Sequence, residues 1–364
     1  YDMAGNVKEW CWNTIDEDKK VIRGGAWNES QYMFGNIDMF PPTMRAENFG
    51  FRCIMPLPGE EIPAVSKVQL PARQPTDFRK VKPCSDEEFE IYKGLYTYDK
   101  TELNPYIEST EELSRSTLLE TVSIDADYED ERIPIHIFLP RNSDPPYQTI
   151  IYFLGDGAHF VDSIFEYGYE YAEIFNKDGR AVVIPHFKGH LERRYERLTG
   201  ESEPPPTGWN EITFMRARDL ARTIDFLETR QDIISEKLAF MGLSGSAAHA
   251  VTLLGVESRL KAAILLSGGV WPLPSEVNPI NFMPRIKIPI IMLNGLYDVS
   301  FPKETNQDAM YSLFGTPDEH KYHETYETGH SLWDKREWVK DALAFLDKYF
   351  GPPNRRVERR DTQK

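Results

Sequence analysis

A serine in a segment of small residues is the first group in the sequence that could do chemistry. Residues 241–250 read MGLSGSAAHA, after a continuous apolar run and before small residues that open a predicted helix. A strand, a sharp turn and a helix in this order hold a serine hydroxyl above a sheet, at the positive end of the helix dipole. Ser244 is therefore a candidate nucleophile, although Ser246 stands where the G-x-S-x-G pattern has its second glycine.

Two downstream residues could supply a base and an acid that orients it. Asp298 follows the apolar run IPIIMLNG, and His330 lies in a loop before the last helical segment. Histidine can take the serine proton and return it to the leaving group, while aspartate fixes the histidine tautomer. Serine, aspartate and histidine in this order, each just beyond a strand, follow the chain order of α/β-hydrolases. In the alternative interpretation, Asp298 caps a turn and His330 is an ordinary loop histidine.

Backbone donors for a developing negative charge are predicted near Ser244. The residue after such a nucleophile, here Gly245, supplies one N–H group. The turn FLGDGAH after an earlier strand should supply a second, with Asp156 as the first candidate and Gly157 as the next. A carboxylate in this position would oppose the developing charge, so if Asp156 donates, its side chain should face away.

Four further polar residues are candidates for the pocket around the predicted nucleophile. His159 follows the turn FLGDGAH and His249 follows Ser244 by five residues, and for both histidines ordinary packing is an equal alternative. Lys188 and Arg193 belong to the basic segment FKGHLERRYER, which follows a strand. Such a cluster is most often a solvated surface, and the alternative is a site for an acidic substrate group.

A metal site is not predicted. His186 and His190 have the i, i+4 spacing of metal ligands on a helix. Pro185 and Gly189 argue against a helix there, and no third ligand is evident. We therefore expect no cofactor in this part of the chain.

Short apolar runs predict the elements that position these residues. Residues 120–128 and 133–140 alternate like antiparallel strands at the edge of a sheet, and helices are predicted over 217–227 and 334–350. Five continuous apolar runs are typical of parallel strands buried on both faces, namely QTIIYFLG, RAVVIPH, KLAFMGLS, KAAILLSGG and IPIIMLNG. The sequence thus predicts an α/β fold, a mostly parallel central sheet with helices on both faces.

Composition divides the chain into four parts. Residues 1–55 are rich in turns and should form a small irregular module that leans on its neighbour or on a missing N-terminal part, because so short a segment buries little surface. Residues 56–84 are predicted to be a proline-rich linker. Residues 85–352 form the α/β domain, beginning with a short amphipathic helix, and residues 353–364 are predicted to be a disordered tail.

Charge and cysteine content restrict the partners. The 364 residues carry a formal net charge of −16, which argues against a nucleic-acid or anionic membrane partner. No apolar run approaches the roughly 20 residues needed to span a bilayer. Cys11, Cys53 and Cys84 are too few and too scattered for a disulfide framework, which predicts a cytoplasmic protein.

The first 53 residues resemble the C-terminal part of the formylglycine-generating enzyme, or sulfatase-modifying factor, domain, which is C-type-lectin-like. The segments DMAGNVKEW, VIRGGAW and RAENFGFRC carry the resemblance and cover the last fifth to quarter of that domain. Active members bind copper through a cysteine pair between the last two segments, where this chain has no cysteine. The resemblance therefore does not imply formylglycine formation, and it makes Asn6 and Glu9 weak candidates for a structural calcium site. The matching positions are Asn6, Glu9, Trp10, Arg23, Gly24, Gly25, Trp27, Arg45, Gly50, Phe51 and Arg52.

A second resemblance covers residues 85–352. GRAVVIPHFKGHLERR, DFLETRQDI and LFGTPDEHKYHETYETGH look like the hydrolase domain of bacterial multidomain proteins. Those proteins fuse a serine/threonine kinase to a sulfatase-modifying-factor-like module and a dienelactone-hydrolase or prolyl-oligopeptidase-like domain. The resemblance implies an α/β-hydrolase fold with Ser244, Asp298 and His330 as its triad. Since the sequence starts without methionine or a signal peptide, we expect upstream domains of the same polypeptide, with a kinase among them.

Two functions remain open at this point. The leading prediction is a serine hydrolase that acts on a small ester, or less favourably on an amide or peptide, through an acyl-enzyme on Ser244. Relatives have a glycine-rich elbow and a different oxyanion turn, whereas this chain has Ser246 and Asp156. These two residues favour the alternative, a weak or inactive hydrolase fold kept as a ligand-binding or protein-binding regulatory module.

Overall fold

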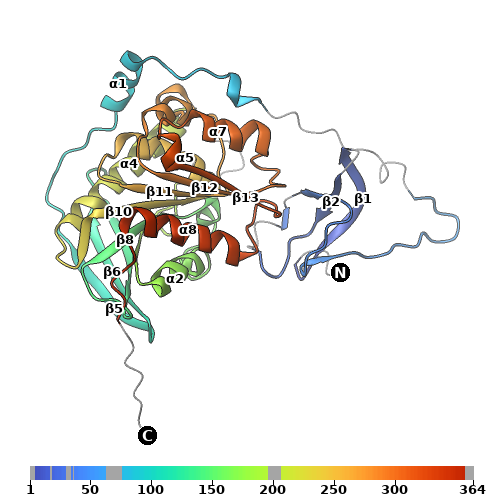
Figure 1. Ribbon diagram of the computed structural model, residues 1–364, viewed down its shortest axis with the longest axis horizontal. Helices are drawn as coiled ribbons and strands as arrows, with labels where there is room; N and C mark the ends of the chain where they lie inside the picture. Colours follow the sequence, from blue (N-terminus) through green and yellow to red (C-terminus); the bar gives the residue numbers. More distant parts are fainter. Residues whose placement is uncertain are drawn as a thin grey trace, which may run out of the picture.

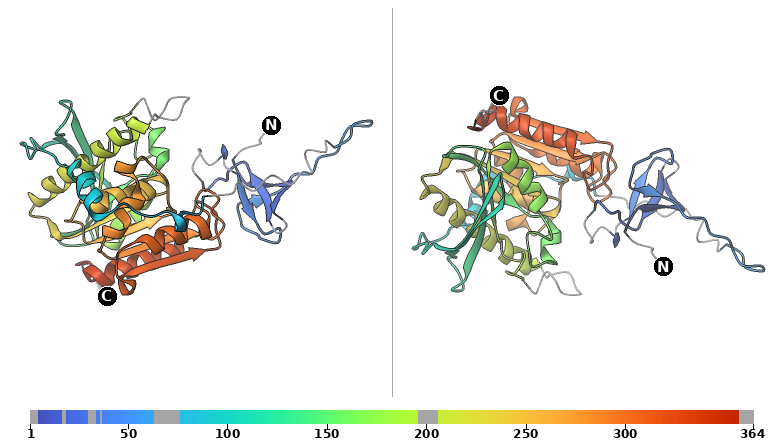
Figure 2. Two further views of the ribbon diagram at one scale, coloured as in Figure 1. Left: turned by 90° about the horizontal axis from the view of Figure 1, so that it is seen from above. Right: turned by 90° about the horizontal axis from the view of Figure 1, so that it is seen from below.

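The protein consists of a small sheet set beside a large α/β domain. The computed structural model describes residues 5–16, 19–29, 34–35, 37–62, 76–195 and 206–356. Figure 1 and both views of Figure 2 show the N-terminal sheet next to the end of β13 (Lys321–Tyr326), with the helices of the large domain on the two faces of its sheet. None of the helices within the described residues combines the length and apolar character needed to cross a bilayer.

The large sheet has nine strands in the described part of the chain, in the order β13-β12-β11-β10-β8-β9-β7-β6-β5. The six strands from β13 to β9 are parallel to one another, whereas β7, β6 and β5 continue the sheet as antiparallel neighbours. The strands other than β13 are β5 (Tyr106–Ser114), β6 (Thr117–Asp125), β7 (Arg132–Pro140), β8 (Tyr147–Phe153), β9 (Ala181–Pro185), β10 (Ile233–Leu243), β11 (Ala262–Leu266) and β12 (Ile290–Gly295).

Helices cover both faces of this sheet. One face carries α4 (Pro206–Glu228) and α5 (Gly245–Val256), and the other carries α2 (Tyr169–Asp178) and α8 (Lys335–Phe350). The remaining helices are α1 (Asp86–Gly94), α6 (Pro279–Phe282) and α7 (Asp308–Leu313). The short 3-10 segments are Phe78–Lys80, Asp156–His159, Ser275–Val277, Met283–Arg285 and Asp318–His320, and Lys303–Gln307 forms a π-turn.

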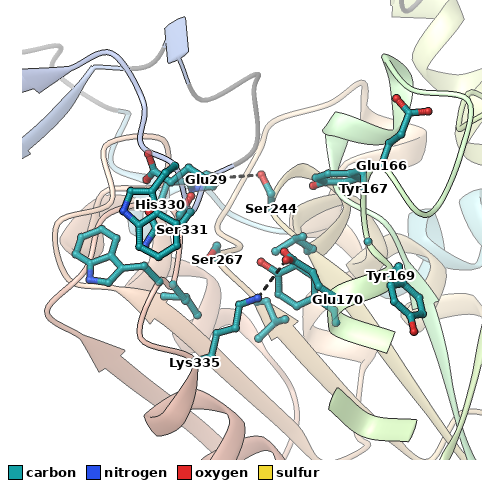
Figure 3. Close-up of a pocket in the computed structure, with 18 of the residues that line it drawn as sticks. Glu29, Glu166, Tyr167, Tyr169, Glu170, Ser244, Ser267, His330, Ser331 and Lys335 are labelled. Carbon is teal, nitrogen blue, oxygen red and sulfur yellow. Dashed lines mark hydrogen bonds and ion pairs between the residues drawn. The ribbon is translucent and has the colours of Figure 1, made fainter. Parts of the chain in front are cut away.

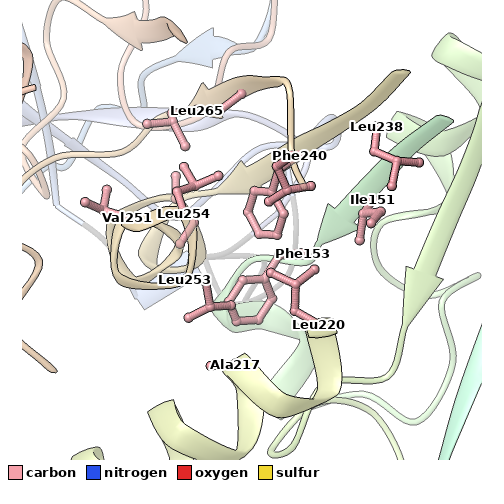
Figure 4. Close-up of a cluster of buried hydrophobic side chains, with 14 of the residues drawn as sticks. Ile151, Phe153, Ala217, Leu220, Leu238, Phe240, Val251, Leu253, Leu254 and Leu265 are labelled. Atoms are coloured by element: carbon pink, nitrogen blue, oxygen red, sulfur yellow. The ribbon is translucent and has the colours of Figure 1, made fainter. Parts of the chain in front are cut away.

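The central strands are buried on both faces because alternate side chains enter two separate cores. In β8, Ile151 and Phe153 pack with the α4 and α5 side, while Ile150 and Tyr152 pack with the α2 and α8 side. Figure 4 shows the first of these cores, where Leu220 and other residues of α4 and α5 lie against the strands. This double burial explains why the strands read as continuous apolar runs.

The N-terminal module is a four-stranded sheet in the order β3-β2-β1-β4 within the described residues. Its strands are β1 (Lys8–Asp16), β2 (Lys19–Arg23), β3 (Asp38–Phe40) and β4 (Phe49–Gly50). The Phe40 ring is fully buried and lies against Tyr297 and Trp333 of the large domain, with centroids 5.5 and 5.7 Å apart. The module therefore leans on its neighbour, as predicted from its length.

The Lys8 side chain is the charged centre of the module. Its ammonium binds the Asp38 carboxylate and lies 2.6 Å from Glu29 Oε1, and all three side chains are buried. Two carboxylates thus share one cation, and burial raises the pKa of Glu29 while the Lys8 charge opposes that rise. A buried charge of this kind is tolerated because it is paired.

The predicted strands and helices of the large domain are present, and some elements were not predicted. β5, β13 and α2 had no prediction, and the helix predicted over 217–227 extends to the bounds of α4. The tail was predicted to be disordered from residue 353, but Arg355 Nε donates to the Asp178 carbonyl at 2.7 Å and the Arg356 N–H donates to the Asn142 carbonyl at 2.7 Å. Residues 63–75 of the predicted linker and 357–364 of the tail lie outside the described residues.

Candidate active site

Ser244 occupies a strained turn between β10 and α5. Its backbone has φ 57° and ψ −126°, a region that a residue with a side chain rarely adopts. A Cβ placed on Gly242 would lie 2.9 Å from the Ala247 Cα, so this first glycine lets the strand pass close to the helix. The Ser244 N–H donates to the Leu266 carbonyl of β11 at 2.8 Å, which ties the turn to the sheet.

The structure brings the three predicted residues together in one hydrogen-bonded row. Ser244 Oγ lies 2.7 Å from His330 Nε2, and His330 Nδ1 lies 2.8 Å from Asp298 Oδ2. Figure 3 shows the contact between Ser244 and His330. All three residues are less than 9% exposed, so water screens these contacts poorly.

Asp298 is fixed by the backbone that follows β12. Its Oδ1 accepts hydrogen bonds from the N–H groups of Ser300 and Phe301, at 2.8 and 3.0 Å, which leaves Oδ2 for His330. The histidine loop runs close to the end of β12, because a Cβ on Gly295 would lie 1.9 Å from the Gly329 carbonyl oxygen. Glycine at this position therefore allows the loop to reach Asp298.

The protonation of His330 is controlled by burial and by three carboxylates. Burial, the largest influence, lowers the pKa of the imidazole, but the charge and hydrogen bond of Asp298 raise it. The charges of Asp38 and Asp156 add to that rise, and the net pKa lies above the ordinary value of 6.5. A histidine in this state is a competent proton acceptor for Ser244 and is stabilised when it becomes charged.

The predicted oxyanion turn lies beside the elbow, but its side chain does not face away. Asp156 begins the 3-10 segment Asp156–His159 that also contains Gly157. A Cβ placed on Gly245 would lie 2.1 Å from Asp156 Oδ2, so the carboxylate lies directly over the first residue of α5. The side chain thus does not have the orientation that we expected of an Asp156 donor, because the positive N-terminal end of α5 is a favourable place for a carboxylate.

His159 and His249 surround this carboxylate but do not line the cavity at Ser244. His159 Nδ1 lies 2.6 Å from the Gly189 carbonyl, and Nε2 lies 4.0 Å from Asp156 Oδ1. Burial lowers the pKa of His249 to about 4, and the charge of Asp156 opposes this shift. Both histidines are therefore packed groups on the Asp156 side of the elbow.

Arg216 is a residue near the elbow that sequence reasoning missed. It is fully buried on α4, and its Nε donates to the Lys188 carbonyl at 2.9 Å. Burial lowers the pKa of its guanidinium to about 10, and the charge of Asp156 is the largest influence in the opposite direction. The amphipathic pattern that predicted a helix over 217–227 began one residue after Arg216 and gave no sign that a buried guanidinium would feel the charge of Asp156.

Lys188 and Arg193 are neither solvated nor turned toward a substrate, which corrects both predicted interpretations. Arg193 Nη1 donates to Asp219 at 2.7 Å and its Nη2 to Glu131 at 2.9 Å, and Lys188 Nζ also binds Glu131. Both basic side chains are nearly buried. They hold the loop after β9 against α4, because acidic partners distant in sequence neutralise them.

The histidine pair that was weighed as a metal site is used in other contacts. His186 Nδ1 lies 2.7 Å from Glu192 Oε2, and its Nε2 lies 2.8 Å from His136 Nδ1. His190 is fully buried, and burial holds its pKa well below 6.5. The described residues contain no group of three or more His, Cys, Asp or Glu side chains arranged to hold a metal ion.

The weak calcium candidates make other contacts in the structure. Both carboxylate oxygens of Glu9 accept from Arg52 Nε at 2.9 Å, and Arg52 Nη2 adds a bond of 2.6 Å. Asn6 adopts a φ of 60° and its carbonyl accepts from the Trp27 N–H. The Glu9 carboxylate is thus committed to an ion pair with Arg52, and the calcium site stays a prediction.

A cavity of about 570 Å³ opens in front of Ser244 and His330. The large domain supplies the loop before α2, the start of α2 and the segment from His330 to Lys335. The N-terminal module supplies Trp27, Asn28, Glu29 and Glu47, which sequence reasoning did not connect with the site. Figure 3 shows Tyr167 on one side of the cavity and His330 on the other, with Lys335 bound to Glu170 below them.

Comparison with known proteins supports the resemblance of the N-terminal module to a known domain. The family model of the sulfatase-modifying factor enzyme 1-like domain matches residues 1–57. A search of curated proteins found no match. The family model thus supports the resemblance of the N-terminal module independently. No curated relative suggests an activity for the chain.

Solved structures show the class of fold. An acetyl xylan esterase from Paenibacillus sp. R4 superposes with a TM-score of 0.56 at 16% identity, over 75% of this chain and 98% of that chain. Acetyl xylan esterase 1 from Thermoanaerobacterium sp. JW/SL YS485 gives 0.55 at 14% identity, over 75% and 98%. A glucuronoyl esterase from Solibacter usitatus gives 0.52 at 14% identity, over 73% and 93%. The large domain therefore has the α/β-hydrolase fold, as predicted.

Proposed function

We propose that the protein is a serine esterase that forms an acyl-enzyme on Ser244. His330 accepts the serine proton during attack on the ester carbonyl and then donates it to the departing alcohol. Asp298 holds the imidazole with Nδ1 protonated and stabilises the positive charge that develops on it. Water then takes the place of the departed alcohol and gives a proton to His330 as it attacks the acyl carbon. His330 returns a proton to Ser244 Oγ as the acyl–Oγ bond breaks and the acid leaves.

The observation that carries this proposal is the Ser244, His330, Asp298 row. Its two contacts of 2.7 and 2.8 Å lie within the range required for proton transfer, and Asp298 Oδ1 is held by two backbone N–H groups. The N-terminus of α5 lies directly beside Ser244, and the first N–H groups of a helix have no acceptor within the helix. An acyl oxygen can be stabilised there.

Esters are preferred to amides or peptides for two reasons. The solved structures with a similar fold include acetyl xylan and glucuronoyl esterases, which supports ester chemistry on this fold. An alkoxide also leaves more readily than an amine, so an ester demands less from an oxyanion site that contains Asp156. A small carboxylic ester is therefore the proposed substrate.

A fluorophosphonate probe tests the nucleophile directly. We expect the wild-type protein to be labelled and Ser244→Ala not to be labelled. Ser312→Ala, which changes an exposed serine of α7, is the matched control and should label like the wild type. Equal labelling of wild type and Ser244→Ala would refute the proposal.

The second candidate function is a hydrolase fold that binds a ligand or protein without efficient turnover. Asp156 favours it, because its carboxylate lies over Gly245 where an oxyanion would be stabilised. Rapid hydrolysis of p-nitrophenyl acetate that disappears in His330→Ala would exclude this candidate. Binding of an ester analogue without turnover would support it.

We also propose that the protein is cytoplasmic and that its polypeptide includes a kinase upstream of this module. A kinase-containing polypeptide upstream of this module rests on the resemblance of both parts of the chain to multidomain proteins. A cytoplasmic location rests on the cysteine content alone, and Cys11, Cys53 and Cys84 are free thiols in the structure. Sequencing of the complete gene and fractionation of cells would test the two proposals separately.

A further inference from the structure

The cavity at Ser244 has walls from two different parts of the chain. Phe165, Glu166 and Tyr169 come from the large domain, and Trp27 and Glu47 come from the N-terminal module. The module contributes none of the reacting groups described above. Its position at the cavity still gives it contact with any ligand that extends beyond the reacting bond.

The module wall is held rigidly relative to the reacting groups. Phe40 packs against Tyr297, which precedes Asp298, and against Trp333, which follows His330 by three residues. Phe49 adds a ring contact with Trp333 at 5.7 Å, and the Lys8 ammonium lies 6.0 Å from the same indole. A wall that packs on the loop of Asp298 and on the loop of His330 can select substrates, since these contacts set its distance from the reacting groups.

The cavity is placed to hold the alcohol part of an ester. It is lined by His330, Ser331 and Trp333, whereas Asp156 and Gly157 on the oxyanion side are outside its lining. His330 must protonate the departing oxygen, so the alcohol lies on the histidine side of Ser244. The group attached to that oxygen therefore extends toward the module.

The chemistry of the walls suits an uncharged ring that carries hydroxyl groups. The Trp27 and Phe165 side chains are 63% and 53% exposed and offer flat apolar faces. Glu47 and Glu166 are exposed carboxylates that can accept hydrogen bonds from hydroxyls. The Lys335 ammonium in the cavity is bound to Glu170 at 3.1 Å, so an anionic alcohol would meet mainly negative charge.

We propose that the N-terminal module forms the alcohol-binding wall of the active site and that Trp27 selects esters of uncharged sugars by stacking on the sugar ring. The proposal rests on the serine esterase function proposed above. It gives the partial sulfatase-modifying-factor-like module a role that does not require the chemistry of complete members of that family.

Two acetyl esters with different alcohols test this selection. Methyl 2-O-acetyl-β-xylopyranoside, which keeps two free hydroxyls, and ethyl acetate, whose alcohol has no ring, transfer the same acyl group, so a variant that affects them differently acts on the alcohol site. We expect Trp27→Ala to lower kcat/KM for the acetylated xyloside about tenfold, mainly through KM, with less than about a twofold change for ethyl acetate. Trp12→Ala is the matched control, because Trp12 is a 68% exposed tryptophan of the same module outside the cavity lining.

The outcomes separate this proposal from the esterase function. If the wild type hydrolyses neither ester, the proposed esterase function is wrong, and the proposed alcohol site is refuted as well. If ethyl acetate is hydrolysed through Ser244 but Trp27→Ala changes both substrates equally or not at all, the proposed sugar wall is wrong and the esterase function is unaffected. Wild-type activity on ethyl acetate without activity on methyl 2-O-acetyl-β-xylopyranoside also overturns the sugar wall.

Discussion

The two parts of the molecule are built by different means and contribute differently to the site. The large domain buries alternate side chains of its central strands in two cores, and Ser244, Asp298 and His330 all project from the ends of that sheet or the loops beyond it. The module has a small sheet around a buried Lys8 with two carboxylates. The proposed reacting groups therefore come from the part with the larger core, because a large core can hold side chains to fractions of an ångström.

The module is secured mainly by its contact with the large domain. Phe40 is its fully buried aromatic residue at the boundary, and its neighbours Tyr297 and Trp333 flank the acid and histidine loops. The module can thus change the surroundings of the site without changing its reacting atoms. Variants in the two parts should consequently fail in different ways.

The largest effect is expected for Asp298→Asn in the large domain. The amide oxygen would keep the bonds from the Ser300 and Phe301 N–H groups, so the amide NH₂ would face His330 Nδ1 and force the wrong tautomer. We expect kcat for an acetyl ester to fall about 10³- to 10⁴-fold with the fold unchanged. Asp308→Asn, which changes another aspartate near a histidine, should retain activity, and a loss below tenfold in Asp298→Asn would contradict the assigned role.

Phe40→Ala in the module should be the next largest change. Removal of a buried aromatic ring typically costs about 3–5 kcal/mol, and this loss falls on the module and its boundary. We expect a separate, earlier unfolding transition of the module in urea, while the large domain keeps its own transition. Phe51→Ala, at a 76% exposed position, is the control, and one unchanged cooperative transition in Phe40→Ala would show that Phe40 is not the anchor.

Sequence patterns predicted the large domain better than the module. A strand buried on both faces must be apolar throughout, so the runs that became β8 to β12 were evident. The ends of these strands located Ser244 and Asp298, and the predicted last helix located His330 in the loop before it. β5 and β13 were missed because their sequences are polar, and most of their side chains are not buried. The resemblance of the module to a known domain was predicted from local segments, and a family model supports it.

The parts of the site that escaped prediction depend on contacts between distant segments. Trp27 and Glu47 reach the cavity through the packing of Phe40, which no local pattern encodes. Lys188 appeared as part of a basic surface because its partner Glu131 lies far away in the sequence. The orientation of Asp156 follows from its position at the start of α5, which is a property of the folded turn.

Asp156→Asn, a change within the large domain, should raise kcat rather than lower it. The carboxylate lies over Gly245, and its charge would oppose an oxyanion at the N-terminus of α5. Removal of the charge with retention of shape should raise kcat about tenfold, a smaller change than the loss of a whole oxyanion donor. Asp162→Asn, at an exposed aspartate paired with Arg194, is the control, and an unchanged or lower kcat in Asp156→Asn would show that the carboxylate does not obstruct turnover.

The smallest effect is expected from the charge of Asp38 in the N-terminal module, which acts on the pKa of His330 in the large domain. His330 must be neutral to accept the serine proton, and its pKa lies above 6.5, so kcat/KM should fall as the pH drops through a value above 6.5. The charge of Asp38 in the module contributes to that raised pKa, and Asp38→Asn removes it while Lys8 keeps Glu29 at 2.6 Å. The acid limb of the pH profile should therefore move to lower pH, with little change in the plateau.

Asp318→Asn removes one negative charge at a 94% exposed side chain and controls for the net charge of the protein. A limb that stays fixed in Asp38→Asn, or moves equally in Asp318→Asn, would mean that the module does not tune His330. A shift in Asp38→Asn alone would show that a residue with no contact to the substrate adjusts the base across the boundary. Because the buried carboxylate is poorly screened, this shift should persist at high salt, whereas any effect of the exposed aspartate should vanish.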